Sequence, residues 1–417
     1  MGVLSAVLHK HGLTRSALAR HGKWIAITFA FFATVINYLD RQTLSVIAPV
    51  LLEKFRISAE SYSRIIFAFM LAYTLMNGAS GVLLDRLGTK IGYAITIAFW
   101  SAMEVLHAFS TGAVSLGIYR FLLGIGEAGN YPAGVKLIAE WFPAEERSLA
   151  SGIFNSGASI GAILAPPLLA LLTISLGWRA AFAIVGLFGF IWLAFWTVLY
   201  RAPHNASQET GTKRTVPFRA LIKSKFLWQF TLSKVFSDPV WYFYIFWIPE
   251  YLKSVHGFSL RAIGETAWIP FTTAAIGNIA GGVVFNLLLR CGIAPPSSRR
   301  VAILLFSVLM AGSVFVGKGG VAECILLISL ATFGYAGAVA NLLALPGDVF
   351  PETMVASLWG FASMGSGFGG MLFSLITGWL VERYSYQPVF ILFGLIPLVA
   401  AWLVWTLPRK EEVAISL

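Results

Sequence analysis

Long runs of apolar residues recur along the whole of this 417-residue chain. Most runs reach about 20 residues, which as an α-helix is enough to cross the roughly 30 Å hydrocarbon core of a bilayer. Charged residues make up only 12% of the chain, whereas soluble domains carry about 25%. The sequence therefore predicts an all-α membrane protein that crosses the bilayer many times.

The apolar runs form two sets of six, separated by a polar stretch. The first set of expected transmembrane helices covers residues 24–51, 62–84, 91–110, 113–140, 148–173 and 178–200. The second set covers residues 226–252, 262–290, 300–317, 321–348, 354–380 and 387–407. The expected domains are an N-terminal segment at 1–23, a six-helix bundle at 24–200, a linker at 201–225, a second six-helix bundle at 226–407 and a tail at 408–417.

The distribution of Lys and Arg predicts which side of the membrane each loop faces. With the N-terminus inside, the inner segments hold 18 of these residues and the outer loops hold 8. Cytoplasmic loops carry the excess of basic residues, so both termini and the linker are expected in the cytoplasm. This distribution accounts for the net charge of +11 without a nucleic-acid partner.

An internal repeat relates the two sets of helices. When the chain is shifted by 208 residues, WFPAEERSLASGIFNSGASIGA at 141–162 aligns with VFPETMVASLWGFASMGSGFGG at 349–370. A Phe-Pro pair and three glycines coincide at this offset. Two homologous halves predict two pseudo-symmetric bundles with a binding site between them, near the middle of the membrane.

Asp40 and Arg41 interrupt the first apolar run, in the segment INYLDRQTLSVIAPV. An ionisable residue at the centre of a transmembrane helix costs about 2.5–3.5 kcal/mol on insertion scales, so each is a candidate functional residue. The apolar run continues beyond the pair, which favours a position within a helix; the alternative is a helix that ends at Leu39. Because adjacent residues project about 100° apart on a helix, the two side chains should have different partners.

Arg120 and Glu127 form a second charged pair, in the segment YRFLLGIGEAGNYPAG of the fourth expected helix. Seven residues separate them, which is two turns and roughly 10 Å along one helix face. Gly124 and Gly126 lie between them and allow a neighbouring helix to come close. A buried Glu beside an Arg suits a proton-binding site, and the alternative is a structural ion pair with Asp40.

Aromatic residues in the seventh expected helix could line a sugar-binding cavity through ring stacking and hydroxyl groups. Trp241 and Tyr244 are the candidates, with packing against lipid or core as the alternative. Weaker candidates for substrate contacts are Asn155, Ser159 and Ser363. No contribution is expected from Glu104 and His107, which fall toward the outer end of the third expected helix.

The segment GVLLDRLGTK joins the second and third expected helices on the inner side. Its Gly81, Asp85, Arg86 and Gly88 predict a tight turn that carries an acid. An acid there can cap a helix N-terminus, which contributes about 0.3–1 kcal/mol. The alternative is a turn exposed to water without a role in gating.

The GVLLDRLGTK segment resembles the loop motif of the major facilitator superfamily. The segments NYLDRQTLSVIAPVL, DRLGTKIGY, EAGNYPAG and EWFPAEERSLASGIFNSGASIGAILAPPL are similar to its anion:cation symporter family, and within it to bacterial hexuronate and sugar-acid transporters. The similarity covers nearly the whole chain and is strongest over residues 35–200. It implies proton-coupled symport of an organic anion by alternating access.

The resemblance also implies roles for individual residues. Arg41 would bind the substrate carboxylate, and Glu127 would be the main proton carrier. Asp40 would pair with Arg120 and could carry a second proton. Tyr38 and Tyr73 match tyrosines that face the substrate in relatives. Asp85 and the rest of the loop motif would hold the inner side closed against the start of the eleventh helix.

The expected protein is thus a transporter of a small organic anion and protons, working as a monomer in the bacterial inner membrane. The substrate is expected to be glucuronate, galacturonate or a related sugar acid. Another carboxylate (an aldonate, an aldarate or an aromatic acid), anion exchange without protons, or a transporter-like sensor are alternatives. No catalytic residue, metal site or cofactor is expected, because no nucleophile-base set or metal-ligand cluster is evident in the sequence.

Overall fold

The computed structural model describes residues 15–202, 224–317, 320–349 and 352–408. Every regular element among these residues is a helix, which confirms the expected all-α class. The expected linker at 201–225 lies almost entirely outside the described residues, as do most of the N-terminal segment and the tail.

The helices of the first half are α2 (Arg15–Phe55), α3 (Ala59–His107), α4 (Ala113–Glu127), α5 (Asn130–Trp141), α6 (Arg147–Leu176) and α7 (Trp178–Leu199). Those of the second half are α9 (Lys225–Ser237), α10 (Pro239–His256), α11 (Leu260–Thr266), α12 (Trp268–Arg290), α13 (Pro295–Met310), α14 (Val321–Val349), α15 (Glu352–Arg383) and α16 (Tyr386–Trp405). Short 3-10 turns follow α5 and α13, at Ala144–Glu146 and Ala311–Phe315.

Eight helical stretches in the described part of the chain are each long and apolar enough to cross a membrane. They correspond to eight of the twelve expected spans. The remaining four expected spans lie in helices that are interrupted. Two of them share α3, where Gly88 has non-helical backbone angles (φ 74°, ψ 161°) that a residue with a side chain rarely adopts.

Each of the other two interrupted spans consists of two helices separated by a break. The fourth expected span consists of α4 and α5, which separate between Glu127 and Asn130. The seventh consists of α9 and α10, and α10 begins at Pro239. Proline has no N–H group to continue the hydrogen bonds of the preceding helix, which explains this break.

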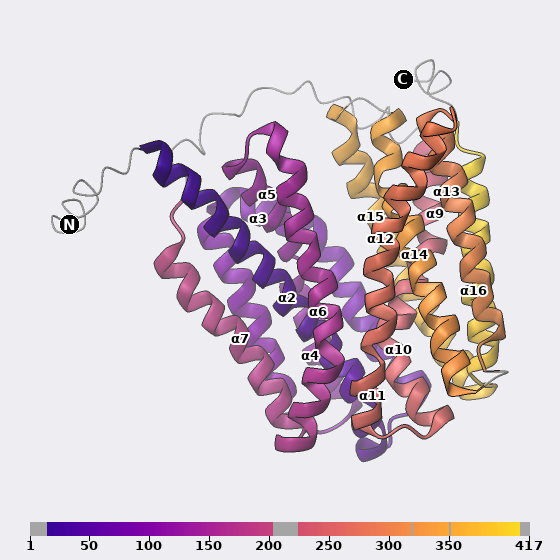
Figure 1. Cartoon of the computed structure of the whole chain (residues 1–417). Helices are drawn as coiled ribbons and strands as arrows, with labels where there is room; N and C mark the ends of the chain where they lie inside the picture. The colour runs from indigo at the N-terminus through magenta and orange to yellow at the C-terminus, as the bar shows by residue number, and fades with distance from the viewer. Residues whose placement is uncertain (1–14, 203–223, 318–319, 350–351, 409–417) are drawn as a thin grey trace.

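The two halves of the chain lie side by side in Figure 1, with α2–α7 in indigo to magenta and α9–α16 in salmon to yellow. The beginning of α2 and the end of α16 lie at the same end of the molecule (Figure 1). We call this the termini end.

The glycines of the repeat make equivalent contacts in the two halves. A Cβ atom on Gly161 of α6 would lie 2.7 Å from the carbonyl oxygen of Val35 in α2. A Cβ atom on Gly369 of α15 would lie 2.4 Å from the carbonyl oxygen of Val235 in α9. Small residues let helix backbones approach this closely. The 208-residue offset in sequence thus corresponds to the same helix packing in each half.

The described hydrogen bonds and ion pairs between the halves lie at the end opposite the termini end. The hydroxyl of Tyr62, near the start of α3, donates to the carbonyl oxygen of Phe246 in α10 at 2.8 Å. A Cβ atom on Gly378 of α15 would lie 2.4 Å from the Cβ of Ser63. Lys253 of α10 lies 3.9 Å from Glu53 of α2.

At the termini end, the ion pairs of the described residues lie within one half. Lys136 pairs with Asp85, and Lys23 pairs with Glu146, all in the first half. Arg299 pairs with Asp348 in the second half. The described polar contacts therefore join the halves at one end of the molecule only.

Candidate functional site

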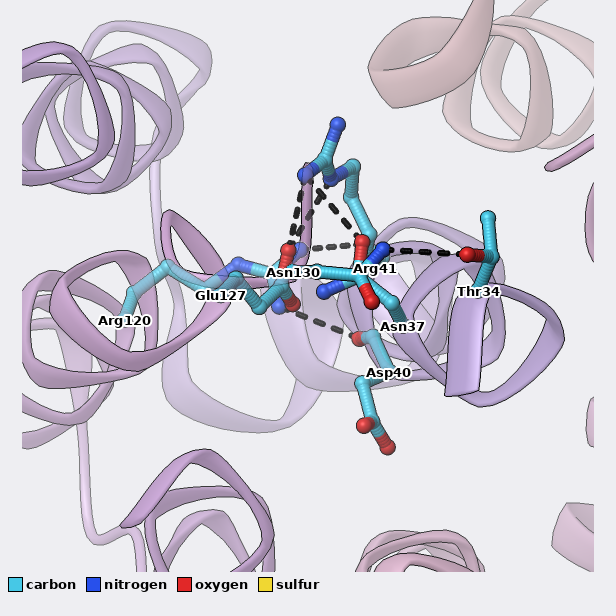
Figure 2. A network of polar contacts seen from close by, with 7 residues as sticks. All are labelled: Thr34, Asn37, Asp40, Arg41, Arg120, Glu127 and Asn130. Atoms are coloured by element: carbon cyan, nitrogen blue, oxygen red, sulfur yellow. Dashed lines mark hydrogen bonds and ion pairs between the residues drawn. The ribbon is translucent and has the colours of Figure 1, made fainter. Parts of the chain in front are cut away.

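A buried ion pair between α2 and α4 forms the centre of the site. Nε and Nη2 of Arg41 each lie 3.0 Å from Oε2 of Glu127 (Figure 2). Arg41 is 5% exposed and Glu127 is 0% exposed. The second carboxylate oxygen of Glu127 has no hydrogen-bond partner among the described residues. Glu127 is therefore held by one cation through a single oxygen.

Arg120 binds the main chain of α2. Its Nη1 donates to the carbonyl oxygen of Asp40 at 3.3 Å, and its Nη2 donates to the carbonyl oxygen of Arg41. Its guanidinium also lies over the ring of Phe69, 5.0 Å from the centroid. Arg120 thus joins α4 to α2 at the charged pair.

The expected ion pair between Asp40 and Arg120 is not formed. Helix α2 continues through Asp40 as far as Phe55, so the alternative of a helix end at Leu39 is wrong. On this continuous helix the Asp40 carboxylate points away from the Arg41–Glu127 pair (Figure 2). Asp40 is 0% exposed, and neither carboxylate oxygen has a hydrogen-bond partner among the described residues.

Three aromatic rings surround the Arg41 guanidinium. Its carbon lies 4.7 Å from the ring centroid of Tyr73, 5.2 Å from that of Tyr38 and 5.4 Å from that of Phe69. Cations at such distances are attracted to ring faces. Tyr38 and Tyr73 are half-buried rather than buried.

Tyr242 of α10 extends this aromatic group into the second half. It lies near enough to Arg41 for electrostatic interaction, and its hydroxyl is 3.5 Å from the Ser366 hydroxyl of α15. The sequence analysis missed Tyr242. Tyr242 follows Trp241 in a run of aromatic residues, and the sequence does not indicate which of these rings faces the first half.

Polar side chains next to the charged pair fix the beginning of α5. Nδ2 of Asn130 donates to the Thr34 hydroxyl at 3.2 Å, and the Tyr93 hydroxyl donates to Oδ1 of Asn130 at 2.6 Å. Asn37 accepts a weak bond from Nη2 of Arg41 at 3.5 Å. These bonds hold α2, α3 and α5 together around the break after Glu127.

The aromatic candidates of the second half differ in position. Trp241 stacks on Tyr335 with centroids 5.4 Å apart, and the Tyr335 hydroxyl donates to Oδ1 of Asp238 at 3.4 Å. Asp238 also pairs with Lys234 at 2.6 Å. Tyr244 is 0% exposed and belongs to the hydrophobic core, so the packing alternative describes its position.

The weaker candidates make no described hydrogen bond to the charged residues. Asn155 and Ser363 are exposed and Ser159 is half-buried. The Ser363 hydroxyl donates to the carbonyl oxygen of Trp359 on its own helix at 2.8 Å.

The loop motif forms a turn that is tied to α5. Asp85 accepts from Lys136 at 2.7 Å, and Lys136 also donates to the carbonyl oxygen of Leu84 at 3.2 Å. Arg86 is exposed, and Gly81 has open space around it. The expected latch lies against the start of the eleventh helix, where the side chains of residues 352–357 are not described.

A cavity of about 570 Å³ lies between α3, α9 and α15. Its lining is mostly apolar and includes Leu75, Trp228, Leu232, Phe361 and Met364. The residue Thr74, which follows Tyr73, also lines it. The charged residues do not line this cavity, and its apolar walls do not suit a hydroxylated anion.

Two buried ionisable residues were not expected to contribute. Glu104 and His107 are both 0% exposed, because α3 continues to His107 and is covered there by α4 and α7. Their position near the end of an expected span gave no sign of burial. Among the described residues no group of three or more His, Cys, Asp or Glu side chains could hold a metal ion.

Comparison with known proteins agrees with the helical architecture. The family model of the Major Facilitator Superfamily matches residues 30–320 and 297–416. A bacterial homologue of the human lysosomal transporter Spinster, solved in an inward-facing and unoccupied conformation, has a similar structure. Its TM-score is 0.71 at 18% sequence identity, and the match covers 94% of this chain and 95% of that one.

Curated relatives are similar over most of the chain. The hexuronate transporter of Escherichia coli (strain K12) is 33% identical over 408 residues, which cover 93% of this chain and 94% of the relative. The galacturonate transporter of Dickeya chrysanthemi is 32% identical over 315 residues, which cover 71% of this chain and 91% of the relative.

Proposed function

The chain belongs to the major facilitator superfamily, and we propose that it imports a hexuronate or a related sugar acid together with protons. The names of its relatives support the substrate class. The observation that carries the proposal is the buried Arg41–Glu127 pair, which lies beside two half-buried tyrosines. The bacterial inner membrane, a monomeric state and cytoplasmic termini are parts of the same proposal.

Competition for Arg41 is the basis of the proposed proton coupling. An ionised Glu127 occupies Nε and Nη2 of Arg41, which are the donors that a substrate carboxylate needs for a bidentate bond. A proton on Glu127 neutralises the carboxylate and leaves Arg41 without a partner. Removing one partner of a buried ion pair costs about 3–5 kcal/mol, so the unpaired Arg41 strongly favours a new anion.

The coupling works in both directions. If a proton on Glu127 favours substrate binding, then bound substrate favours a proton on Glu127 by the same free energy. Substrate and proton therefore bind together and leave together. A substrate that binds without its proton would place two carboxylates on one guanidinium.

The remaining predicted residues would recognise the sugar. Tyr38 and Tyr73 offer ring faces and hydroxyl groups beside Arg41, and Tyr242 would contribute from the second half. Trp241 would offer a ring for stacking. Asn155, Ser159 and Ser363 would contact the hydroxyl groups of the substrate.

The arrangement of the halves agrees with an inward-facing state. The described polar contacts between the halves lie away from the termini end. With cytoplasmic termini, these contacts close the site toward the outside. In the proposed cycle, Gly81, Asp85, Arg86 and Gly88 would form the inner gate once the halves close at the termini end.

The proposed function is tested by Glu127→Gln in proteoliposomes loaded with a pH gradient and labelled glucuronate. Gln cannot change its charge, so the variant should lose accumulation driven by the gradient. It should keep counterflow exchange, because an uncharged residue 127 leaves Arg41 available to substrate. Glu265→Gln, which removes an exposed acid from a pair on one helix, is the control and should accumulate substrate normally. Accumulation by Glu127→Gln against a gradient would refute the role of Glu127.

A further inference from the structure

Lys234 and Asp238 form a second buried ion pair, in the half of the molecule that does not contain Arg41. Nζ of Lys234 lies 2.6 Å from Oδ2 of Asp238. The pair lies near the middle of the seventh expected span, where α9 ends and α10 begins at Pro239. Ionisable residues inside a membrane-spanning segment are costly and mark functional sites. The proposed competition between Glu127 and substrate for Arg41 makes no use of this pair.

A structural role alone does not account for the Lys234–Asp238 pair. A buried ion pair is often no more stable than apolar residues of similar volume. The ammonium of Lys234 has three donors, and Asp238 is its one ion-pair partner among the described residues. The other oxygen of Asp238 accepts from the Tyr335 hydroxyl at 3.4 Å, and the carboxylate still has lone pairs to offer. The pair can therefore both donate to a bound molecule and accept from it.

Aromatic rings lie beside this pair. Trp241 stacks on Tyr335 with an angle of 7° between the ring planes, and Trp241 is half-buried. A flat ring face suits the apolar C–H face of a sugar, and the ion pair suits its hydroxyl groups. We call these four residues the second-half cluster: Lys234, Asp238, Trp241 and Tyr335.

Two tyrosines connect the second-half cluster to the Arg41 site. Tyr242 lies near enough to both Asp238 and Arg41 for electrostatic interaction. Tyr335 is equally close to Asp238 and to Tyr38 of the first half, whose ring lies beside Arg41. The second-half cluster and Arg41 therefore belong to one region between the halves.

The internal repeat and the exposure of the side chains agree with this position. The 208-residue offset aligns Tyr335 of α14 with Glu127 of α4, and equivalent positions in pseudo-symmetric halves border a shared central site. The side chains of Lys234 and Asp238 are each 7% exposed and that of Arg41 is 6% exposed, whereas that of Glu127 is 0% exposed. Arg41 and the second pair thus reach the accessible surface to the same small extent.

The charge of the pair decides which chemical group can bind there. Lys234 and Asp238 together are neutral, so an uncharged group with several hydroxyls leaves no charge without compensation. A carboxylate in the same place would bring a second negative charge next to Asp238. Like charges brought together away from water are strongly unfavourable.

We propose that the second-half cluster binds the hydroxylated end of the substrate while Arg41 binds its carboxylate. Asp238 excludes a second carboxylate from this end. The transporter therefore accepts hexuronates and rejects aldarates, which carry a carboxylate at both ends. The inference rests on the proposed function, because it requires the first carboxylate to be on Arg41.

Calorimetry on the purified protein with glucuronate and with glucarate tests this selection. Glucarate carries a second carboxylate where glucuronate has its aldehyde carbon. The wild type should bind glucarate at least about tenfold more weakly than glucuronate. In Asp238→Asn, the charge of Lys234 is free to receive the second carboxylate, so the preference for glucuronate should fall by about tenfold or more. A preference for a sugar ring over an open chain would not respond to this change of charge.

Asp348→Asn is the matched control, because it removes an acid that pairs with Arg299 at the termini end of the same half. It should keep the preference of the wild type, and a loss of preference there as well would overturn the assignment to Asp238. An unchanged preference in folded Asp238→Asn would also overturn the proposal.

The wild-type measurement is decisive whether or not Asp238→Asn folds. Equal affinities of the wild type for glucuronate and glucarate would overturn this inference alone and leave the proposed function standing. Absence of glucuronate binding would overturn the proposed function together with the inference.

Discussion

Arg41 has two possible anionic partners, and the chemistry of its side chain decides how well it discriminates between them. The guanidinium donates from Nε and Nη2 to one oxygen of Glu127 while its plane lies among the rings of Tyr38 and Tyr73. A planar fork can form two parallel bonds to a substrate carboxylate, and a lysine ammonium cannot. The account therefore depends on the shape of this cation as well as on its charge.

Arg41→Lys should weaken the binding of a sugar acid by about 10- to 150-fold, the equivalent of roughly 1.5–3 kcal/mol for one hydrogen bond to a charged group. The measurement is substrate affinity by calorimetry on purified protein. Arg64→Lys is the control, because Arg64 makes an exposed ion pair with Glu60 on its own helix. An affinity of Arg41→Lys equal to that of the wild type would contradict the assigned role.

At this scale the sequence identified the charged residues but not their partners. Asp40, Arg41, Arg120 and Glu127 are detectable because charge is rare in apolar helices. Whether Arg120 meets the carboxylate or the carbonyl oxygen of Asp40 depends on the rotation of α4 against α2, which the chain does not encode locally. Glu104 was overlooked because its burial depends on neighbouring helices.

At the scale of helices, glycines determine how closely α6 approaches α2 and how closely α15 approaches α9. A Cβ on Gly161 or Gly369 would lie within 2.8 Å of main-chain oxygen. Real contacts of this kind do not occur, so a methyl group must push the helices apart. Each half should respond in the same way, since the repeat places the two glycines in equivalent positions.

Gly161→Ala and Gly369→Ala should each destabilise the protein by about 1–3 kcal/mol, the typical cost of overpacking. Thermal unfolding in detergent, followed by tryptophan fluorescence, measures the change. Gly152→Ala and Gly360→Ala are matched controls at the same 208-residue offset, because an added Cβ there meets no atom within 4 Å. Equal unfolding temperatures for the two pairs would contradict this packing argument.

The helices themselves were largely predictable from the sequence. Apolar runs located the spans, whereas the break between α9 and α10 at Pro239 is a finding of the structure. The break between α4 and α5 was not predicted, although it lies directly after Glu127. Asn130 and Thr34, which are hydrogen-bonded beside this break, belong to different helices. No local sequence pattern therefore predicts the break.

At the scale of the whole molecule, the two halves are in contact at the end opposite the termini end. The repeat and the superfamily predict that two halves exist, but not which end is closed. That choice depends on a small free-energy difference between two arrangements, to which contacts such as Tyr62–Phe246 contribute. Substrate and proton act on this balance through Arg41 of α2 and Glu127 of α4.

The central claim is that substrate and proton cross the membrane together through Arg41 and Glu127. Proton flux and labelled glucuronate flux, recorded together in weakly buffered proteoliposomes without a pH gradient, test it most directly. Because one proton on Glu127 frees Arg41 for one carboxylate, we expect a substrate gradient to drive proton influx with one proton per glucuronate and no net charge movement. Glucuronate entry without proton influx would contradict the account.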